Sequence, residues 1–351
     1  MTDNTWPTVD TELIDDVTLY SAKLIIPVTG PVIIDGAVAI HGDRVVHVGK
    51  RRWVLKALKQ EMTAHGTIHE RHWDGVLTPG LINAHTHLQY SGMVQVGQGT
   101  YDRFRAWELA FNEVYAEAQK TQPWKQWAED GARQMVESGT TAAADIVTDL
   151  DAAGALASQG MHGIAYWEVM GWHNAEWMEK GRTELIRQLR RMNEEQLPNL
   201  GISPHAPYTL ESEPFVDLPD IARQLNMRLH IHLAETPLEA GTYPPVLTTY
   251  SAADWSDHDW ESYRQLKEVG KGASAIQFVD QLGSLGPDVH IAHGVWANGE
   301  DRRILRQRGV GVALCPRSNR ITNTGKDAPV REYLEEGNLV SVGTDSLSST
   351  P

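Results

Sequence analysis

The sequence predicts an α/β fold, a (β/α)8 barrel of the TIM type preceded by a small β-sandwich segment. From Pro79 onward, short apolar stretches alternate with longer amphipathic ones, as strands and helices do in a parallel barrel. Several of these stretches end in His, Glu or Asp, and the carboxyl ends of barrel strands carry the active site. No glycine-rich phosphate loop follows the first strand, which disfavours an open doubly wound sheet.

Residues 1–76 are expected to form the N-terminal β-sandwich segment. Residues 36–49 alternate apolar and polar side chains on both sides of Gly42 and Asp43, a pattern that predicts a hairpin. This β-rich segment looks like only half of a sandwich, so we expect the remaining strands elsewhere in the protein.

Residues 77–351 are expected to form the barrel. Eight strands are predicted, at 79–87, 140–147, 161–170, 199–205, 228–235, 288–293, 309–315 and 338–345. Helices are predicted between them, at 103–119, 124–138, 174–195, 218–226, 298–308 and 328–336. The chain ends soon after the eighth strand, so we expect the eighth helix and the remaining sandwich strands, about 60–100 residues, to be missing from it.

The connection over 236–272 is longer than a barrel crossover needs, and it carries several Tyr and Trp residues. It is either a lid over the mouth of the barrel or an insertion packed on the outside.

Composition excludes several classes of partner. The net charge of −15 argues against binding to a nucleic-acid backbone, and no apolar run is long enough to cross a membrane. Cys315 is the only cysteine and the N-terminus lacks the pattern of a signal peptide, so a cytoplasmic protein is expected. The expected partner is a small-molecule substrate, and a homo-oligomer is compatible with the sequence.

Four candidate metal ligands stand at or near predicted strand ends. His85 and His87 are two residues apart in a strand, so both imidazoles lie on one face. His232 stands near the end of another strand and is preferred over His230 because it lies nearer the rim and Glu235 follows it closely, and Asp345 ends the last predicted strand. Three imidazoles and a carboxylate suit one divalent ion, with Zn²⁺ favoured and Fe²⁺ or Mn²⁺ as alternatives.

Two acid–base groups accompany these ligands. Glu235 follows His232 by three residues and is the candidate proton shuttle between a water and the substrate. His293, at the end of the next strand, could orient that water and help to deprotonate it, and Asp345 is expected to share this role. A metal ion would supply the remaining activation by lowering the pKa of the water.

Four further residues are candidates for binding substrate. His205 follows the fourth strand, and its alternative role is a hydrogen bond that stiffens the loop. Arg317 offers a planar fork for a carboxylate or phosphate, or else a structural ion pair. Glu168 ends the third strand and Trp107 lies on the first crossover, where an aromatic residue is also typical of the core.

These residues resemble the amidohydrolase superfamily. The resemblance rests on the N-terminal β segment, on residues 79–87 with their two histidines, on His232 with Glu235, on His293 and on residues 343–346. It is greatest for the single-metal aminohydrolase branch, because the fourth strand ends in Ser203-Pro204-His205 and lacks the lysine that bridges two metals in other branches.

The resemblance implies a hydrolase of non-peptide carbon–nitrogen bonds that deaminates an aminated heteroaromatic ring. Within the branch, the chain looks closest to aminodeoxyfutalosine and S-adenosylhomocysteine deaminases. The implied substrate is therefore an adenine nucleoside, and a carboxylated one would give Arg317 a role. The alternatives are a cytosine or guanine deaminase, a triazine chlorohydrolase, a cyclic-amide hydrolase, or an inactive fragment.

Overall fold

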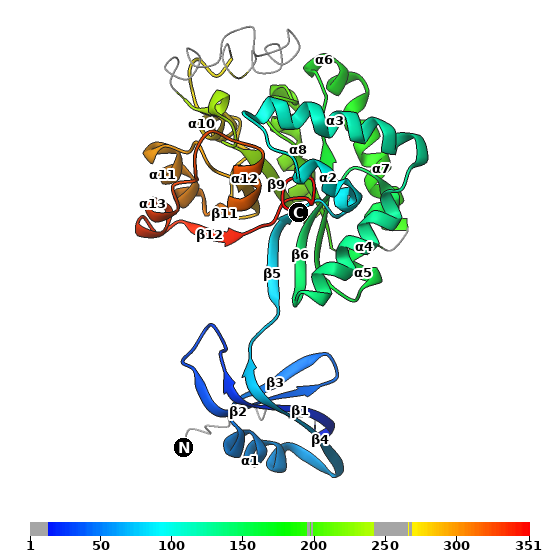
Figure 1. Cartoon of the computed structure of the whole chain (residues 1–351), viewed down its shortest axis with the longest axis vertical. Helices are drawn as coiled ribbons and strands as arrows, with labels where there is room; N and C mark the ends of the chain where they lie inside the picture. Colours follow the sequence, from blue (N-terminus) through cyan, green and yellow to red (C-terminus); the bar gives the residue numbers. More distant parts are fainter. Residues whose placement is uncertain (1–12, 195–196, 198, 242–265, 267–268) are drawn as a thin grey trace, which may run out of the picture. The chain divides into compact units, whose positions relative to one another are not determined.

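The structure is a computed structural model that describes residues 13–194, 197, 199–241, 266 and 269–351. The chain divides into two compact units, Met1–Gly80 and Leu81–Pro351 (Figure 1). The sequence analysis placed this boundary after residue 76, at the end of strand β4 (Met62–Leu77). Among the described residues, none of the helices combines the length and the apolar character that crossing a bilayer requires.

The first unit contains one mixed sheet with strand order β3-β2-β1-β4. Strands β1 (Ile14–Ile25), β2 (Ile33–His41) and β3 (Arg44–Lys50) are antiparallel neighbours, and β4 runs parallel to β1. The predicted hairpin is confirmed as β2 and β3. Helix α1 (Arg51–Glu61) was not predicted, although its Val54 and Leu58 are spaced one helical turn apart and are buried.

The second unit confirms the predicted barrel of eight parallel strands. Its sheet runs in sequence order from β5 to β12. The strands are β5 (Leu81–Thr86), β6 (Thr140–Val147), β7 (His162–Val169), β8 (Leu200–Pro204), β9 (Arg228–Leu233), β10 (Val289–His293), β11 (Gly311–Leu314) and β12 (Leu339–Val342). Each lies within a predicted strand.

Helices surround these strands, as Figure 1 shows. The longer ones are α3 (Phe104–Thr121), α4 (Trp124–Glu137), α7 (Arg182–Glu194), α8 (Ser212–Gln224), α10 (Ala275–Gln281) and α11 (Gly299–Arg308). Two six-residue helices, α12 (Pro316–Ile321) and α13 (Val330–Glu335), accompany the last two strands. Short turns complete the connections: η1 (Leu88–Met93), α2 (Val94–Gly97), η2 (Leu150–Ala152), α5 (Ala155–Ser158) and η4 (Pro237–Glu239).

Three helix predictions differ from the structure. The single helix expected over 174–195 is divided into α6 (Asn174–Glu176), a wide π turn η3 (Trp177–Gly181) and α7, and the turn buries Trp177 completely. Helix α8 begins at Ser212 rather than at 218, because its early Pro214 is compatible with a first helical turn. Helices α10 and α12 were not predicted, since seven and six residues are too few to display a helical period. The predicted lid over 236–272 lies mostly outside the described residues.

The barrel is closed at one point. Within the described chain, the two edge strands β5 and β12 are joined by an isolated parallel bridge between Thr86 and Asp345, just beyond the end of β12. That bridge lies at the carboxyl ends of the strands, where the predicted site residues stand.

Candidate active site

Strand β5 delivers two buried imidazoles to the carboxyl end of the barrel. The ring centroids of His85 and His87 lie 5.0 Å apart, and the two side chains are 0% and 9% exposed. Burial lowers the pKa of His85 well below its usual value and that of His87 to about 4, although the charge of Asp345 opposes the shift at His87. Both nitrogens of His85 and Nδ1 of His87 are buried without a hydrogen-bond partner. The two rings are therefore neutral and have lone pairs available.

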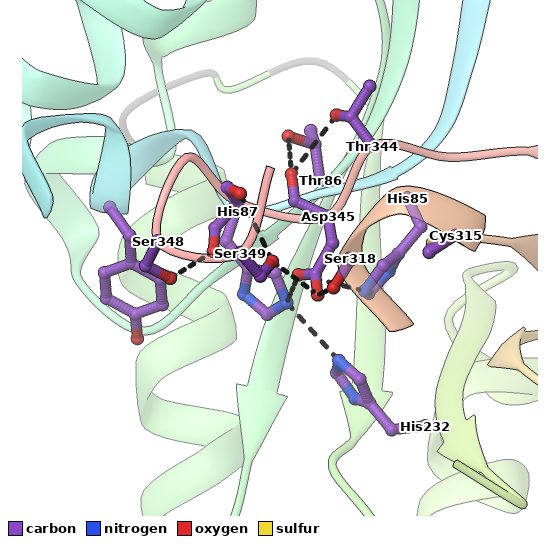
Figure 2. A network of polar contacts seen from close by, with 12 residues as sticks. His85, Thr86, His87, His232, Cys315, Ser318, Thr344, Asp345, Ser348 and Ser349 are labelled. Atoms are coloured by element: carbon purple, nitrogen blue, oxygen red, sulfur yellow. Dashed lines mark hydrogen bonds and ion pairs between the residues drawn. The ribbon is translucent and has the colours of Figure 1, made fainter. Parts of the chain in front are cut away.

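Strand β9 adds a third imidazole. The Nε2 atom of His232 lies 3.3 Å from Nε2 of His87, and the rings of His232 and His85 are 4.8 Å apart (Figure 2). On the other side of the ring, Nδ1 of His232 is 3.2 Å from the carbonyl oxygen of His205, to which a protonated Nδ1 donates. Nε2 is then the lone-pair nitrogen, and it faces the other two histidines. His230 instead contacts the carbonyl oxygen of Ala84 through Nε2, at 3.0 Å.

Asp345 completes the cluster from the segment after β12. Its Oδ2 accepts hydrogen bonds from Ser318 Oγ at 2.6 Å and Ser349 Oγ at 3.1 Å. Its Oδ1 lies 3.8 Å from Nε2 of His85 and 3.6 Å from Nε2 of His87. The two serines thus fix one carboxylate oxygen, and the other oxygen faces the histidines, as Figure 2 shows.

This donor set fits a divalent metal ion. The three distances between facing donor atoms of His232 and His87, of His85 and Asp345, and of His87 and Asp345 lie between 3.3 and 3.8 Å. Ligands bonded at about 2.0–2.2 Å around a tetrahedral ion are separated by about 3.4 Å, which agrees with these spacings. Neutral buried imidazoles with lone pairs that face one another and a single oriented carboxylate oxygen are also the chemistry that such an ion requires.

Glu235 follows β9 in a turn that a second carboxylate holds. Ala234 adopts φ +54°, and Glu239 accepts hydrogen bonds from the backbone N–H groups of Ala234, Glu235 and Thr236 at 2.8, 2.9 and 2.9 Å. Burial, followed by the charges of Asp345 and Glu239, raises the pKa of Glu235 well above its usual value. The raised pKa favours the protonated carboxyl group, which is the form that donates a proton.

His293 faces Glu235 from the end of β10. Its Nε2 lies 3.5 Å from Oε1 of Glu235, and its Nδ1 lies 2.9 Å from Oδ1 of Asn319. An amide oxygen accepts from a protonated Nδ1, so Nε2 is left as the basic nitrogen that faces the site. His293 itself has φ +73°, an uncommon conformation for a residue with a side chain. Such strain persists where surrounding contacts hold it, often at functional sites.

A cavity of about 640 Å³ opens over these groups. Its walls are rich in aromatic side chains, contributed by Tyr90, Phe104, Trp107, Phe111, Tyr115, Trp167, Trp172 and Tyr208. Trp107 is fixed by a hydrogen bond from Nε1 to the carbonyl oxygen of Ser348, at 2.8 Å. The predicted residue Trp107 is therefore a wall of the cavity.

Glu168 and His205 also line the cavity, on the side of His232. The Oε1 atom of Glu168 is buried without a hydrogen-bond partner and lies 3.8 Å from Nδ1 of His232. Burial, helped by the charge of Asp345, raises the pKa of Glu168 to about 8. The Nδ1 atom of His205 shares a hydrogen bond with Thr209 Oγ1 at 2.8 Å. His205 therefore makes the expected loop-stiffening hydrogen bond and also lines the cavity.

Arg317 is not brought to the cavity, contrary to the sequence prediction. It lies exposed on α12 and is absent from the described cavity lining. The reason is the helical period of α12, which turns Ser318 and Asn319 inward to Asp345 and His293 and leaves Arg317 outward.

Sequence reasoning missed several residues of the site, among them Ser318, Asn319, Ser349 and Glu239. Ser318 and Asn319 belong to the same segment as Arg317, which the sequence analysis considered. Which residues of this segment face inward depends on the helix that starts at Pro316. Glu239 had a readable signal, because Thr236-Pro-Leu-Glu239 has the spacing of a capping box, which the structure contains.

The sequence profile of the Amidohydrolase family matches residues 76–243 and 246–350, so the chain belongs to this family. A 5-methylthioadenosine/S-adenosylhomocysteine deaminase of Moorella thermoacetica is 30% identical over 337 residues, which cover 93% of this chain and 68% of that protein. Two further nucleoside deaminases are matched over only 59% and 58% of their lengths. The chain thus spans about three fifths to two thirds of such relatives.

Solved structures share the fold at lower identity. An adenosine deaminase of Xanthomonas campestris with bound zinc has a TM-score of 0.71 at 21% identity, covering 96% of this chain and 70% of that one. An aminofutalosine deaminase of Helicobacter pylori, in complex with methylthio-coformycin, has a TM-score of 0.72 at 19% identity, covering 95% and 78%. The profile match confirms the predicted family, and the relatives named here are deaminases, hydrolases of non-peptide carbon–nitrogen bonds.

Proposed function

We propose that this protein is a zinc-dependent deaminase of an adenine nucleoside, which replaces the amino group of the ring by oxygen and releases ammonia. The observation that carries the proposal is geometric: the buried carboxyl group of Glu235 lies 3.5 Å from Nε2 of His293, beside four candidate metal ligands at the base of an aromatic cavity. Burial raises the pKa of this carboxyl group and lowers that of the imidazole. The substrates in the names of the relatives support adenine as the ring.

His85, His87, His232 and Asp345 would hold the ion. When bound, a divalent cation supplies Lewis-acid chemistry, lowering the pKa of water and offsetting negative charge on oxygen. His293 Nε2 is placed to accept the proton of the attacking water, whose oxygen forms a bond to the ring carbon that carries the amino group. Asp345 shares in holding and deprotonating this water.

Glu235 performs the complementary proton transfer. It donates its proton to the ring nitrogen next to the attacked carbon, which removes the aromaticity that opposes addition. The amino group then takes the proton held by His293 and leaves as ammonia when the carbon–nitrogen bond breaks. Glu235, now a carboxylate, removes the remaining proton of the added water as the ring carbonyl forms, which restores the protonated Glu235 and the neutral His293. Glu235 thus moves protons between water and substrate in both halves of the reaction. Its raised pKa favours the protonated, donating form that this order of events requires.

The aromatic walls would stack on the purine, while Glu168 and His205 would receive its other polar groups. A carboxyl oxygen without a partner in a cavity is a ready acceptor for a substrate hydroxyl, such as those of a ribose. We therefore propose Trp107, Glu168 and His205 as substrate-binding residues. Arg317 is not proposed, because it lies on the outer face of α12.

The charge of the cavity bears on the substituent of the nucleoside. Among the described residues that line it there are several carboxyl groups and neither lysine nor arginine. A nucleoside with an uncharged substituent, such as 5-methylthioadenosine, is therefore expected to be a better substrate than a carboxylated one, which would leave its charge uncompensated.

An ammonia-release assay with zinc-loaded protein tests the proposal. The panel holds adenosine, 5-methylthioadenosine, a carboxylated adenine nucleoside, cytosine, guanine, a chlorinated triazine and a cyclic amide. The expected result is one ammonia per hypoxanthine-type product from the adenine nucleosides, with the uncharged ones preferred in kcat/KM. Chloride release or a ring-opened product without ammonia would contradict the proposal.

A further inference from the structure

The seam between the first and last barrel strands passes through the proposed metal site. His85 and His87 belong to β5, while Asp345 follows β12, and within the described residues these two strands pair only at Thr86 and Asp345. The remaining bonds across the seam gather at the same place. The N–H groups of Thr344 and Asp345 donate to the carbonyl oxygen of His85 at 3.1 and 2.9 Å, and Thr86 Oγ1 donates to the carbonyl oxygen of Asp345 at 2.9 Å.

Asn83 adds a side-chain link to this seam. Its Nδ2 donates to Thr344 Oγ1 at 2.7 Å, and its Oδ1 accepts from the N–H of Thr344 at 3.0 Å. The same Oδ1 lies 3.4 Å from the backbone nitrogen of His85. One buried amide, 6% exposed, therefore contacts the residue before one metal ligand and the backbone of another.

Asp345 needs such support because its backbone is strained. It has φ +61°, a conformation that is unfavourable for a residue with a side chain and persists only where surrounding contacts hold it. The neighbouring chain approaches closely as well, since a Cβ on Gly343 would lie 2.8 Å from Cβ of His85. The position of Asp345 Oδ1 opposite His85 and His87 thus depends on how residues 343–345 are held against β5.

We infer that Asn83 is a positioning residue for the metal site, which holds the Thr344 peptide so that Asp345 Oδ1 faces His85 and His87 across the seam. The amide suits this role because it donates to one group of Thr344 and accepts from another at once. Metal binding and the Asn83 link then hold the same two strands together, so each strengthens the other. The inference rests on the proposed metal site.

The test measures zinc affinity and thermal stability of the intact protein with Asn83→Ala. Its matched control is Asn338→Ala, which removes another buried asparagine that lies just before β12 and bonds the carbonyl oxygen of Arg302 at 2.8 Å, away from the ligands. We expect Asn83→Ala to weaken zinc binding by about 10–100-fold and to reduce the rise in Tm on adding zinc. Asn338→Ala should lower Tm while zinc affinity stays at the wild-type value.

Equal zinc affinity in wild type, Asn83→Ala and Asn338→Ala would overturn the inference and leave Asn83 a structural residue. If Asn83→Ala does not fold, Thr344→Val decides. It removes the hydroxyl partner and keeps the backbone N–H, so it should weaken zinc binding by a smaller factor, and unchanged affinity would refute the role. A folded wild-type protein that binds no zinc would instead refute the metal site itself.

Discussion

At the scale of single residues, the site depends on groups whose charge state is set by burial. Glu235 and Glu168 are acids with raised pKa values, whereas His85, His87, His232 and His293 are bases with lowered ones. The same desolvation thus gives neutral acids that donate and neutral imidazoles that accept. Both forms are needed at neutral pH for metal binding and for proton transfer to a ring.

Replacement of Glu235 by Gln should separate catalysis from metal binding. The amide keeps the size of the side chain but cannot carry a proton from water to the ring. We expect kcat for ammonia release to fall by about 10²–10⁴ while zinc content, measured by elemental analysis, stays at the wild-type level. Activity at the wild-type rate would remove Glu235 from the mechanism.

Asp145 on β6 provides a pH test of stability. Its Oδ1 accepts from the N–H of Leu88 at 2.9 Å, its Oδ2 has no partner, and burial raises its pKa to about 8 from an ordinary value of 3.8. The folded protein therefore holds a proton that the unfolded chain releases at lower pH. This contribution to stability is complete below about pH 4 and is lost as the pH rises toward 8.

The variant Asp145→Asn cannot titrate, so its Tm should depend less on pH than that of the wild type between pH 5 and 8.5. At pH 8.5 it should melt about 1–2 °C higher than wild type, the shift expected for about 1 kcal/mol in a chain of this size. Parallel pH profiles of the two proteins, measured by thermal melting, would show that Asp145 is not the titrating group.

At the scale of elements, short connections present the catalytic groups and the strands fix their spacing. The turn after β9 holds Glu235 through three backbone N–H groups bonded to Glu239. Helix α12 in turn presents Ser318 to Asp345 and Asn319 to His293. The strands bring these side chains close together, and the connections orient them as acids and bases.

Replacement of Glu239 by Gln should disturb this turn, because an amide cannot accept hydrogen bonds through both of its terminal atoms. We expect kcat to fall by about 10–100-fold, the scale for groups that orient catalytic residues, with zinc content unchanged because His232 precedes the turn. The control is Glu211→Gln, since Glu211 also accepts a backbone N–H, that of Asn174 at 2.6 Å, away from the site. Equal losses in both variants would mean a general effect on folding.

At the scale of the whole molecule, the strands of the barrel were predictable because each is a short apolar run and these runs alternate with amphipathic helical stretches along the sequence. The candidate site residues were predictable for a related reason, since His85, His87, His232, His293 and Asp345 all stand at or just beyond strand ends. The aromatic lining of the cavity was anticipated only through Trp107.

Other parts depended on tertiary placement that no local pattern reveals. Helix α12 is too short to show a helical period in the sequence. Arg317 was therefore predicted to face the site, whereas its neighbours Ser318 and Asn319 are the residues that do. Asn83 was not singled out, because one buried amide carries no signal until β12 is brought beside β5. Helix α1 was missed because its sequence follows a hairpin in a segment otherwise made of strands.

The most direct test of the account is a crystal structure of the zinc-loaded protein with anomalous diffraction measured at the zinc edge. The account predicts one strong peak per chain, bonded at about 2.0–2.2 Å to nitrogens of His85, His87 and His232 and to Oδ1 of Asp345. A peak held instead by Glu168 and His205, or a zinc-loaded crystal with no peak among these four side chains, would contradict it.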